Sequence, residues 1–217
     1  MAADEGTIVA GGQSLADAAG SEVVEALVRA LELHDYRRGL FGENEGHGIR
    51  VTRLALRLAE RVAPELAADP RLEYGFRLHD IGMIGVSDSI LSKRGSLTQD
   101  ELDEVREHPL LGERIVASVS CLRGIARQVI GAHHERWNGS GYPRRLEAER
   151  IPLAARIFAL ADVFDAMTSE QPWRNAFAPE VALAEIERGS GVLFDPELVP
   201  VFLELAGSAV ALDRSLA

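Results

Sequence analysis

The stretch HGIRVTRLALRLAERV, residues 47–62, has the clearest helical periodicity in this 217-residue chain. Its apolar residues recur at spacings of three and four, as on the buried face of an amphipathic helix. These residues are Val51, Leu54, Ala55, Leu58, Ala59 and Val62. His47 lies one turn before Val51 on the same face, so we expect its side chain to point into the protein.

Apolar residues and histidines share faces of further expected helices. The sets are Leu72, Phe76 and His79, then Ile125, Val129 and His133, and then Leu153, Ile157, Leu160, Ala161 and Phe164. Thr98 and Glu101 have the spacing of a capping box at a helix start. Residues 136–150 contain Gly and Pro, which predict an exposed loop. Strand patterns are nearly absent, so the sequence predicts an all-α domain.

The composition, with 47% apolar and 26% charged residues, is typical of a folded protein. Residues 1–20 are rich in Gly, Ala and Ser without a period, so we expect a mobile N-terminal tail before one domain over residues 21–217. The sequence has no signal-peptide pattern, no apolar run of membrane-spanning length and a single cysteine, Cys121, which favours the cytoplasm. A net charge of −11 argues against nucleic-acid polymers and anionic membranes as partners.

Three of the six histidines stand next to another potential metal ligand, in the pairs His79–Asp80 and His133–His134. Histidine and aspartate without cysteine suit divalent Fe, Mn, Co, Ni or Zn. Adjacent helical residues point about 100° apart, so each pair can serve two neighbouring ions. Taken singly, each histidine is also compatible with a hydrogen-bonded core residue, which is our interpretation of His34.

Three segments resemble the signature blocks of the HD-GYP family, a bacterial branch of the HD phosphohydrolases. They are HDIGMIGVSDSIL (79–91), HHERWNGSGYP (133–143) and IPLAARIFALADVFDAMTSEQPWR (151–174). The resemblance implies an HD-domain helical bundle with an extended GYP loop, the loop that contains Gly139, Gly141, Tyr142 and Pro143. It also implies two or three divalent ions, with Fe or Mn preferred, and hydrolysis of the second messenger cyclic di-GMP.

The resemblance also implies roles for individual residues. The implied metal ligands are Glu43, His47, His79, Asp80, His108, His133, His134 and Asp162. Asp80 would bridge two ions, and Glu43 would hold a third, with Glu45 as the competing choice. Tyr142 in the GYP loop and Arg174 would contact the substrate. Asp165 would orient a ligand or move a proton, or else form a structural hydrogen bond to the GYP loop.

The sequence departs from the family pattern at several positions. Met83 stands where the family has a lysine, Arg145 replaces a glycine after the GYP motif, and Asn175 follows Arg174 where a second basic residue is common. Arg144, Arg145 and Arg174 are candidates for supplying the missing positive charge.

We therefore expect a phosphodiesterase that opens cyclic di-GMP to pGpG, GMP or both, with a metal-bridged water as nucleophile and Asp80 and Asp165 as catalytic residues. One alternative is a weakly catalytic module that binds metal and cyclic dinucleotide, and another is an HD hydrolase of a different phosphoester. As partners, the resemblance implies a diguanylate cyclase (GGDEF) domain that docks on the GYP loop. A homodimer is a further arrangement that the sequence leaves open.

Overall fold

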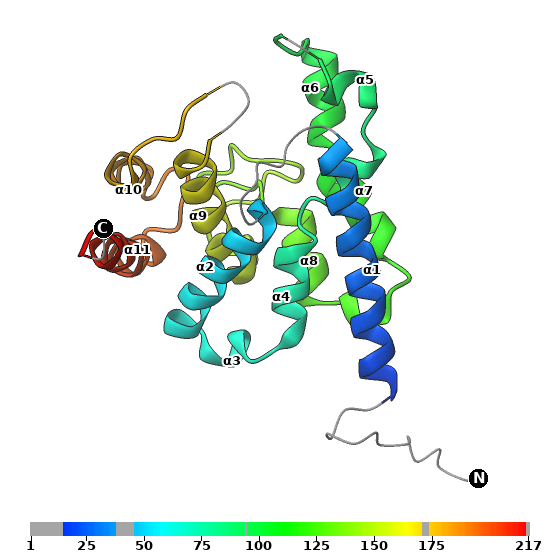
Figure 1. Ribbon diagram of the computed structural model, residues 1–217, viewed down its shortest axis with the longest axis horizontal. Helices are drawn as coiled ribbons and strands as arrows, with labels where there is room; N and C mark the ends of the chain where they lie inside the picture. The colour runs from blue at the N-terminus through cyan, green and yellow to red at the C-terminus, as the bar shows by residue number, and fades with distance from the viewer. Residues whose placement is uncertain (1–14, 38–45, 94, 171–173, 216–217) are drawn as a thin grey trace.

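A computed structural model describes the backbone of residues 15–37, 46–93, 95–170 and 174–215 (Figure 1). In these ranges β pairing is limited to two isolated bridges, so the predicted all-α fold is confirmed. The helices are α1 (Leu15–Arg37), α2 (His47–Val62), α3 (Pro64–Ala67), α4 (Pro70–Arg77), α5 (Asp88–Leu91), α6 (Gln99–Arg106), α7 (His108–Val116), α8 (Ile125–Ala132), α9 (Leu153–Thr168), α10 (Pro179–Arg188) and α11 (Leu198–Ser215). Short 3-10 helices lie at Ile81–Gly85 (η1), Ser120–Leu122 (η2) and Ala148–Arg150 (η3).

Helices α2, α4, α8 and α9 form the centre of the bundle, with α2 packed on α9 and α4 packed on α8 (Figure 1). Helices α10 and α11 cover one side, and α1 covers the opposite side. Phe76, Phe158 and Phe202 are fully buried in the main core, which confirms the inward face predicted for Phe76. A second apolar cluster joins α1 to α8 through residues such as Val24 and Ile130. This packing fixes the ends of α2, α4 and α8. The histidines and aspartates that the sequence singles out lie at or near those ends.

Helix α1 begins at Leu15, inside the range for which the sequence predicts a mobile tail, so residues 15–20 are helical instead. Residues 1–14 lie outside the described part of the chain. A methyl group at Gly20 would lie only 3.1 Å from Cβ of Cys121, and the Cys121 thiol donates to the Gly20 carbonyl at 3.5 Å. Gly20 therefore allows α1 to pack closely against the segment before α8, which contains Cys121.

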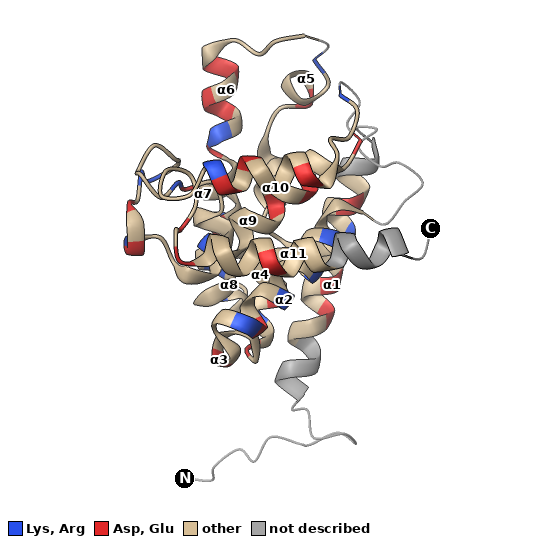
Figure 2. Ribbon diagram, turned by 90° about the vertical axis from the view of Figure 1, so that its left-hand side faces the viewer, with Lys and Arg blue, Asp and Glu red and all other residues tan. Residues whose placement is uncertain are grey.

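Helix α6 starts with the predicted capping box. The Glu101 amide donates to Thr98 Oγ1 at 3.3 Å, and the Thr98 amide donates to Glu101 Oε2 at 2.7 Å. Figure 2 shows acidic residues along α6 and a basic residue at its inner end. That residue is Arg106, the last of α6, and α7 begins two residues later at His108.

The last described helix, α11, begins at Leu198. Asp195 serves the helix start, because its Oδ1 accepts from the Glu197 amide at 2.9 Å. Helix α11 is 18 residues long, but neither it nor another described helix is long and apolar enough to span a membrane.

Candidate metal centre

Two sets of potential metal ligands lie side by side among the described residues. One set comprises Asp80, His108, His133 and His134, and the other comprises His47, His79 and Asp162. Within each set the candidate ligand atoms lie within 4.8 Å of one another. The residues come from the start of α2, the turn after α4, the start of α7, the end of α8 and the middle of α9. The fold thus brings together every metal ligand predicted from the sequence except Glu43, which, like Glu45, lies outside the described residues.

Asp80 lies between the two sets and presents one carboxylate oxygen to each. Its Oδ2 is 3.3 Å from Nε2 of His79 in one set. Its Oδ1 is 3.2 Å from Nε2 of His108 and 3.5 Å from Nε2 of His133 in the other set. A carboxylate placed in this way can be shared by two cations, as the sequence leads us to expect for Asp80.

Three histidines are oriented by backbone carbonyls behind them. Nδ1 of His79 lies 2.9 Å from the Phe76 carbonyl, and Nδ1 of His108 lies 2.8 Å from the Val105 carbonyl. Nδ1 of His133 lies 3.0 Å from another carbonyl, that of Ile130. Because a carbonyl only accepts, each Nδ1 must carry the proton, which leaves the Nε2 lone pair free to face a metal.

The nitrogens of His108 and His133 supply a test of whether the residues fit a metal. Their Nε2 atoms are 3.1 Å apart, and both carry lone pairs when each ring is neutral with its proton on Nδ1, the state in which a metal binds. Two lone pairs at this distance repel one another unless a cation lies against both. The donor set, borderline nitrogens with hard carboxylate oxygens, therefore fits divalent ions such as Fe or Mn.

Electrostatics favour the ionised form of Asp80 and the neutral form of His134, which are the forms that metal binding requires. Burial raises the pKa of Asp80, but the charge of His79 and hydrogen bonds from His108 and His133 outweigh it and hold that pKa well below its usual value. Burial, together with the neighbouring His133, lowers the pKa of His134 well below its usual value. The carboxylate is thus ionised and His134 neutral at neutral pH.

Asp165 orients the histidine at the start of α2. Its Oδ2 lies 2.7 Å from Nδ1 of His47, while Nε2 of His47 lies 3.2 Å from Asp162 Oδ1. Burial lowers the pKa of His47, but hydrogen bonds with Asp162 and Asp165 raise it to about 10. Arg50 fixes Asp165 in turn, with Nε and Nη2 donating to its two oxygens at 2.7 and 2.9 Å. Asp165 is thus bonded to α2, and it also accepts from the Ser169 hydroxyl at 3.4 Å. None of these described side-chain hydrogen bonds reaches the GYP loop.

We expect Asp165→Asn to weaken divalent-metal binding about 10- to 100-fold, the range typical of partners that orient a metal ligand. The amide keeps the shape of the side chain but loses the charge that aligns His47. Metal titration of the metal-free protein measures this, with the exposed Asp100→Asn on α6 as the matched control. Unchanged affinity in Asp165→Asn would contradict the orienting role.

The GYP loop places Tyr142 against the first ligand set. The Tyr142 ring stacks on His134 with centroids 4.7 Å apart, and its centroid is 6.4 Å from that of His108. The Tyr142 amide donates to the His134 carbonyl at 3.2 Å. A Cβ at Gly141 would lie 2.3 Å from the Arg136 amide nitrogen, so the loop requires glycine there.

A buried carboxylate holds this loop in place. Glu135 is only 4% exposed, and its two oxygens accept from the Arg144 amide at 2.7 Å and the Leu146 amide at 3.0 Å. The Arg144 guanidinium pairs with Glu113 and donates to the Gly131 carbonyl. The loop is thus tied to the segment that carries His133 and His134.

Arg145 adopts φ of 52°, in the left-handed region that favours glycine, which explains why the family has glycine at this position. We expect Arg145→Gly to stabilise the protein by about 0.5–1 kcal/mol, because the relieved strain exceeds the added entropy of the unfolded chain. Urea unfolding measures the change. Arg145→Ala keeps the Cβ and should give no such gain. A loss of stability in the glycine variant would contradict this account.

Two of the three arginines that were candidates for supplying the missing positive charge, Arg174 and Arg144, make other contacts. Arg174 donates to the Ala166 carbonyl at 2.6 Å and the Met167 carbonyl at 3.2 Å, and lies 4.5 Å over the Phe177 ring. Its described contacts are therefore at the end of α9, and its contact with substrate stays a prediction. Arg144 braces the GYP loop instead.

Sequence reasoning missed three residues that shape the site: Arg50, Glu135 and Arg106. Arg50 lies three residues after His47, a spacing that predicts neighbours on one helix face. Glu135 directly follows the histidine pair, but its partners come from across a loop turn, which no periodicity reveals. Arg106 lies 6.0 Å from the Tyr142 ring centroid, a contact between two distant segments.

The sequence profile described as an HD domain matches residues 28–198 of the chain. The protein therefore belongs to the HD domain family. Its resemblance to the HD-GYP branch is confirmed by its relatives. One of them is a cyclic di-GMP phosphodiesterase of Thermotoga maritima, which is 40% identical over 185 residues. The match covers 85% of this chain and 49% of the relative. The cyclic di-GMP phosphodiesterase response regulator RpfG of Xanthomonas campestris is 39% identical, with 84% and 47% covered.

Solved structures agree with this assignment. A cyclic GMP-AMP specific phosphodiesterase of Vibrio cholerae superposes with a TM-score of 0.62 at 27% identity, over 90% of this chain and 50% of that one. An HDG"Y"P protein from Bdellovibrio bacteriovorus, with a TM-score of 0.58 at 20% identity over 73% and 51% of the two chains, shares the fold. The chain spans about half the length, or less, of the curated relatives that it matches.

Proposed function

We propose that this chain is a metal-dependent phosphodiesterase that hydrolyses cyclic di-GMP to pGpG, GMP or both. The observation that carries the proposal is the placement of Asp80, whose two oxygens face two adjacent ligand sets. Paired cation sites of this kind suit the in-line cleavage of a phosphodiester. The substrate class comes from relatives named cyclic di-GMP phosphodiesterases at 36–42% identity.

A second candidate substrate is 3′3′-cGAMP. A Vibrio cholerae relative named 3′3′-cGAMP-specific phosphodiesterase 2 is 33% identical over 90% of this chain, and 36% of its own length is covered. Both molecules are cyclic dinucleotides with two phosphodiesters, so one site of this geometry can take either. The bases distinguish them, and the metal ligands do not read the bases.

The proposed metal ligands are His47, His79, Asp80, His108, His133, His134 and Asp162, with Glu43 for a third ion. Two or three divalent ions, Fe or Mn, would activate water and withdraw charge from the phosphate oxygens. Asp165 acts in the proposal by orienting His47. Burial raises the pKa of Tyr142, so its hydroxyl stays protonated and can donate a hydrogen bond to a phosphate oxygen.

Turnover of cyclic di-GMP and of 3′3′-cGAMP by anaerobically purified protein, with the metal content counted and products separated by chromatography, tests the proposal. We expect pGpG or GMP from protein that holds two or more ions per chain. Binding of the dinucleotide without product would favour the weakly catalytic sensor module instead. Hydrolysis confined to other phosphoesters would assign the chain to another class of HD hydrolase.

The remaining partners stay predictions from the family resemblance. They are a diguanylate cyclase (GGDEF) domain docked on the GYP loop and a second copy of the chain in a homodimer. The cytoplasmic location is likewise a prediction. Pull-down with a GGDEF domain and sedimentation of the purified protein would test the two assemblies.

A further inference from the structure

A cyclic dinucleotide carries two negative phosphodiesters on opposite sides of its ring. When one lies at the ligand sets for cleavage, the other must lie outside them. This outer phosphate binds more tightly where a separate cation faces it. The question is which described side chain can supply that cation.

Three arginines near the site, Arg50, Arg144 and Arg174, are engaged in the structure itself. Arg50 pairs with Asp165 through both carboxylate oxygens. Arg144 pairs with Glu113, and Arg174 donates to carbonyls at the end of α9. Withdrawing any of these would leave a carboxylate or carbonyl behind without its donor, at a cost in free energy.

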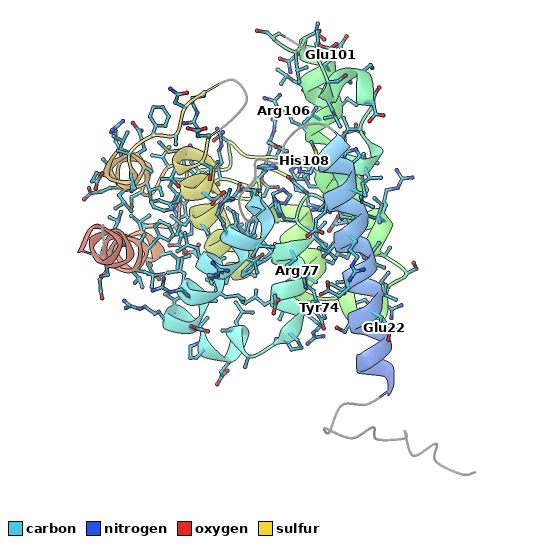
Figure 3. The ribbon with its side chains drawn as sticks, viewed as in Figure 1. Glu22, Tyr74, Arg77, Glu101, Arg106 and His108 are labelled. Carbon is cyan, nitrogen blue, oxygen red and sulfur yellow. The ribbon has the colours of Figure 1, made fainter. Side chains whose placement is uncertain are left out.

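Arg106 differs in position and in partner. Its guanidinium carbon lies 6.0 Å from the centroid of the Tyr142 ring, and that ring stacks on His134 of the first ligand set. Figure 3 labels Arg106 above His108, near the junction of α6 and α7. Arg106 is thus one aromatic ring away from the ligands.

The salt bridge that Arg106 makes is weak. Its Nη1 lies 3.1 Å from Asp103 Oδ1, and the two side chains are 48% and 60% exposed. Exposed pairs of this kind contribute little to stability, so exchanging Asp103 for a phosphate costs little. A guanidinium also matches the geometry of phosphate oxygens.

We propose that Arg106 binds the phosphate of the cyclic dinucleotide that is not being cleaved, beside the Tyr142 ring. The inference rests on the proposed function, since it assumes a substrate with two phosphates. If so, Arg106 determines specificity for substrates with two phosphates. Arg106 would also supply a positive charge in a chain that has Met83 where the family has a lysine.

Arg106→Gln tests this in two measurements: equilibrium binding of cyclic di-GMP, and steady-state hydrolysis of cyclic di-GMP and of bis(p-nitrophenyl) phosphate, which has one phosphate. We expect the Kd and KM for cyclic di-GMP to rise about 10-fold or more, as for a lost charged hydrogen bond. The loss on the one-phosphate substrate should be several-fold smaller. Arg106→Lys should restore part of the affinity, because it keeps the charge.

Arg114→Gln, an exposed residue on α7, is the matched control, since it removes the same charge at a distance from Tyr142. Equal losses in both variants, equal losses on both substrates, or unchanged binding in Arg106→Gln would overturn the inference. If the wild type binds cyclic di-GMP without cleaving it, the proposed hydrolysis fails and the Kd ratio still decides the role of Arg106. If the wild type does not bind it, both proposals fail.

Discussion

Asp80→Asn is expected to abolish metal retention and to lower cyclic dinucleotide hydrolysis by on the order of 10³-fold, the effect of losing several kcal/mol of transition-state stabilisation. The asparagine keeps the shape of the side chain but loses the negative charge shared between two ligand sets. Oδ2 of Asp80 lies 3.3 Å from the His79 nitrogen, and Oδ1 lies 3.2 Å from the His108 nitrogen. One substitution therefore disturbs both sets at once.

Metal counting by mass spectrometry and product chromatography measure the effect of Asp80→Asn, and circular dichroism shows whether the helices persist. Asp88→Asn on α5 is the matched control, because it removes the same charge from an exposed position. A helical Asp80→Asn protein that keeps two ions and normal turnover would show that the carboxylate is not shared between them.

The ligand sets could be predicted from the sequence because their residues obey local rules. His47 lies on the apolar face of α2, one turn before Val51, and the pairs His79–Asp80 and His133–His134 place two ligand types in adjacent positions. The family motifs then named the remaining ligands. Residue type and position along the helix indicated the first of these residues, and the family motifs were needed for His108 and Asp162.

Asp165 was expected to orient a ligand from its motif position, but the contacts that the orienting groups make could not be predicted in the same way. Asp165 reaches His47 across 118 positions of sequence. Glu135 holds loop amides through a turn, and Arg106 reaches Tyr142 from the end of another helix. Each contact depends on how segments meet in space, which neither periodicity nor composition encodes. For Arg174 the motif position predicts contact with substrate. Its described hydrogen bonds instead go to backbone carbonyls at the end of α9.

The helices were predictable to within a few residues wherever a cap or a proline marks the boundary. Thr98 and Glu101 form the expected capping box, and a proline, Pro179, stands at the start of α10. Helix α1 begins at Leu15, within the range 1–20 that the sequence assigns to a tail, and glycine and alanine are as typical of tails as of tightly packed helices. Only the contact between Gly20 and Cys121 distinguishes the two cases.

Arg156→Ala is expected to lower the free energy of unfolding by about 3 kcal/mol, as for breaking a buried ion pair. Arg156 donates from Nη1 to Asp195 Oδ2 at 2.5 Å and from Nε to the Ile151 carbonyl at 2.9 Å. The Asp195 side chain is only 2% exposed. Its carboxylate would therefore remain buried without its main partner, and the end of the GYP loop at Ile151 would lose a donor.

Urea unfolding of the wild type and variants measures this loss. Arg188→Ala is the matched control, because its pair with Glu185 is exposed on α10 and should change stability by less than about 0.5 kcal/mol. Arg156→Lys keeps the charge but cannot donate to both partners at once. Its loss in free energy of unfolding should therefore lie between the losses of Arg156→Ala and Arg188→Ala. Equal stability of Arg156→Ala and Arg188→Ala would show that the connection between α9 and the start of α11 does not stabilise the fold. If the predicted order is found, this ion pair is what fixes the far end of the GYP loop, as Glu135 fixes the end beside the histidines.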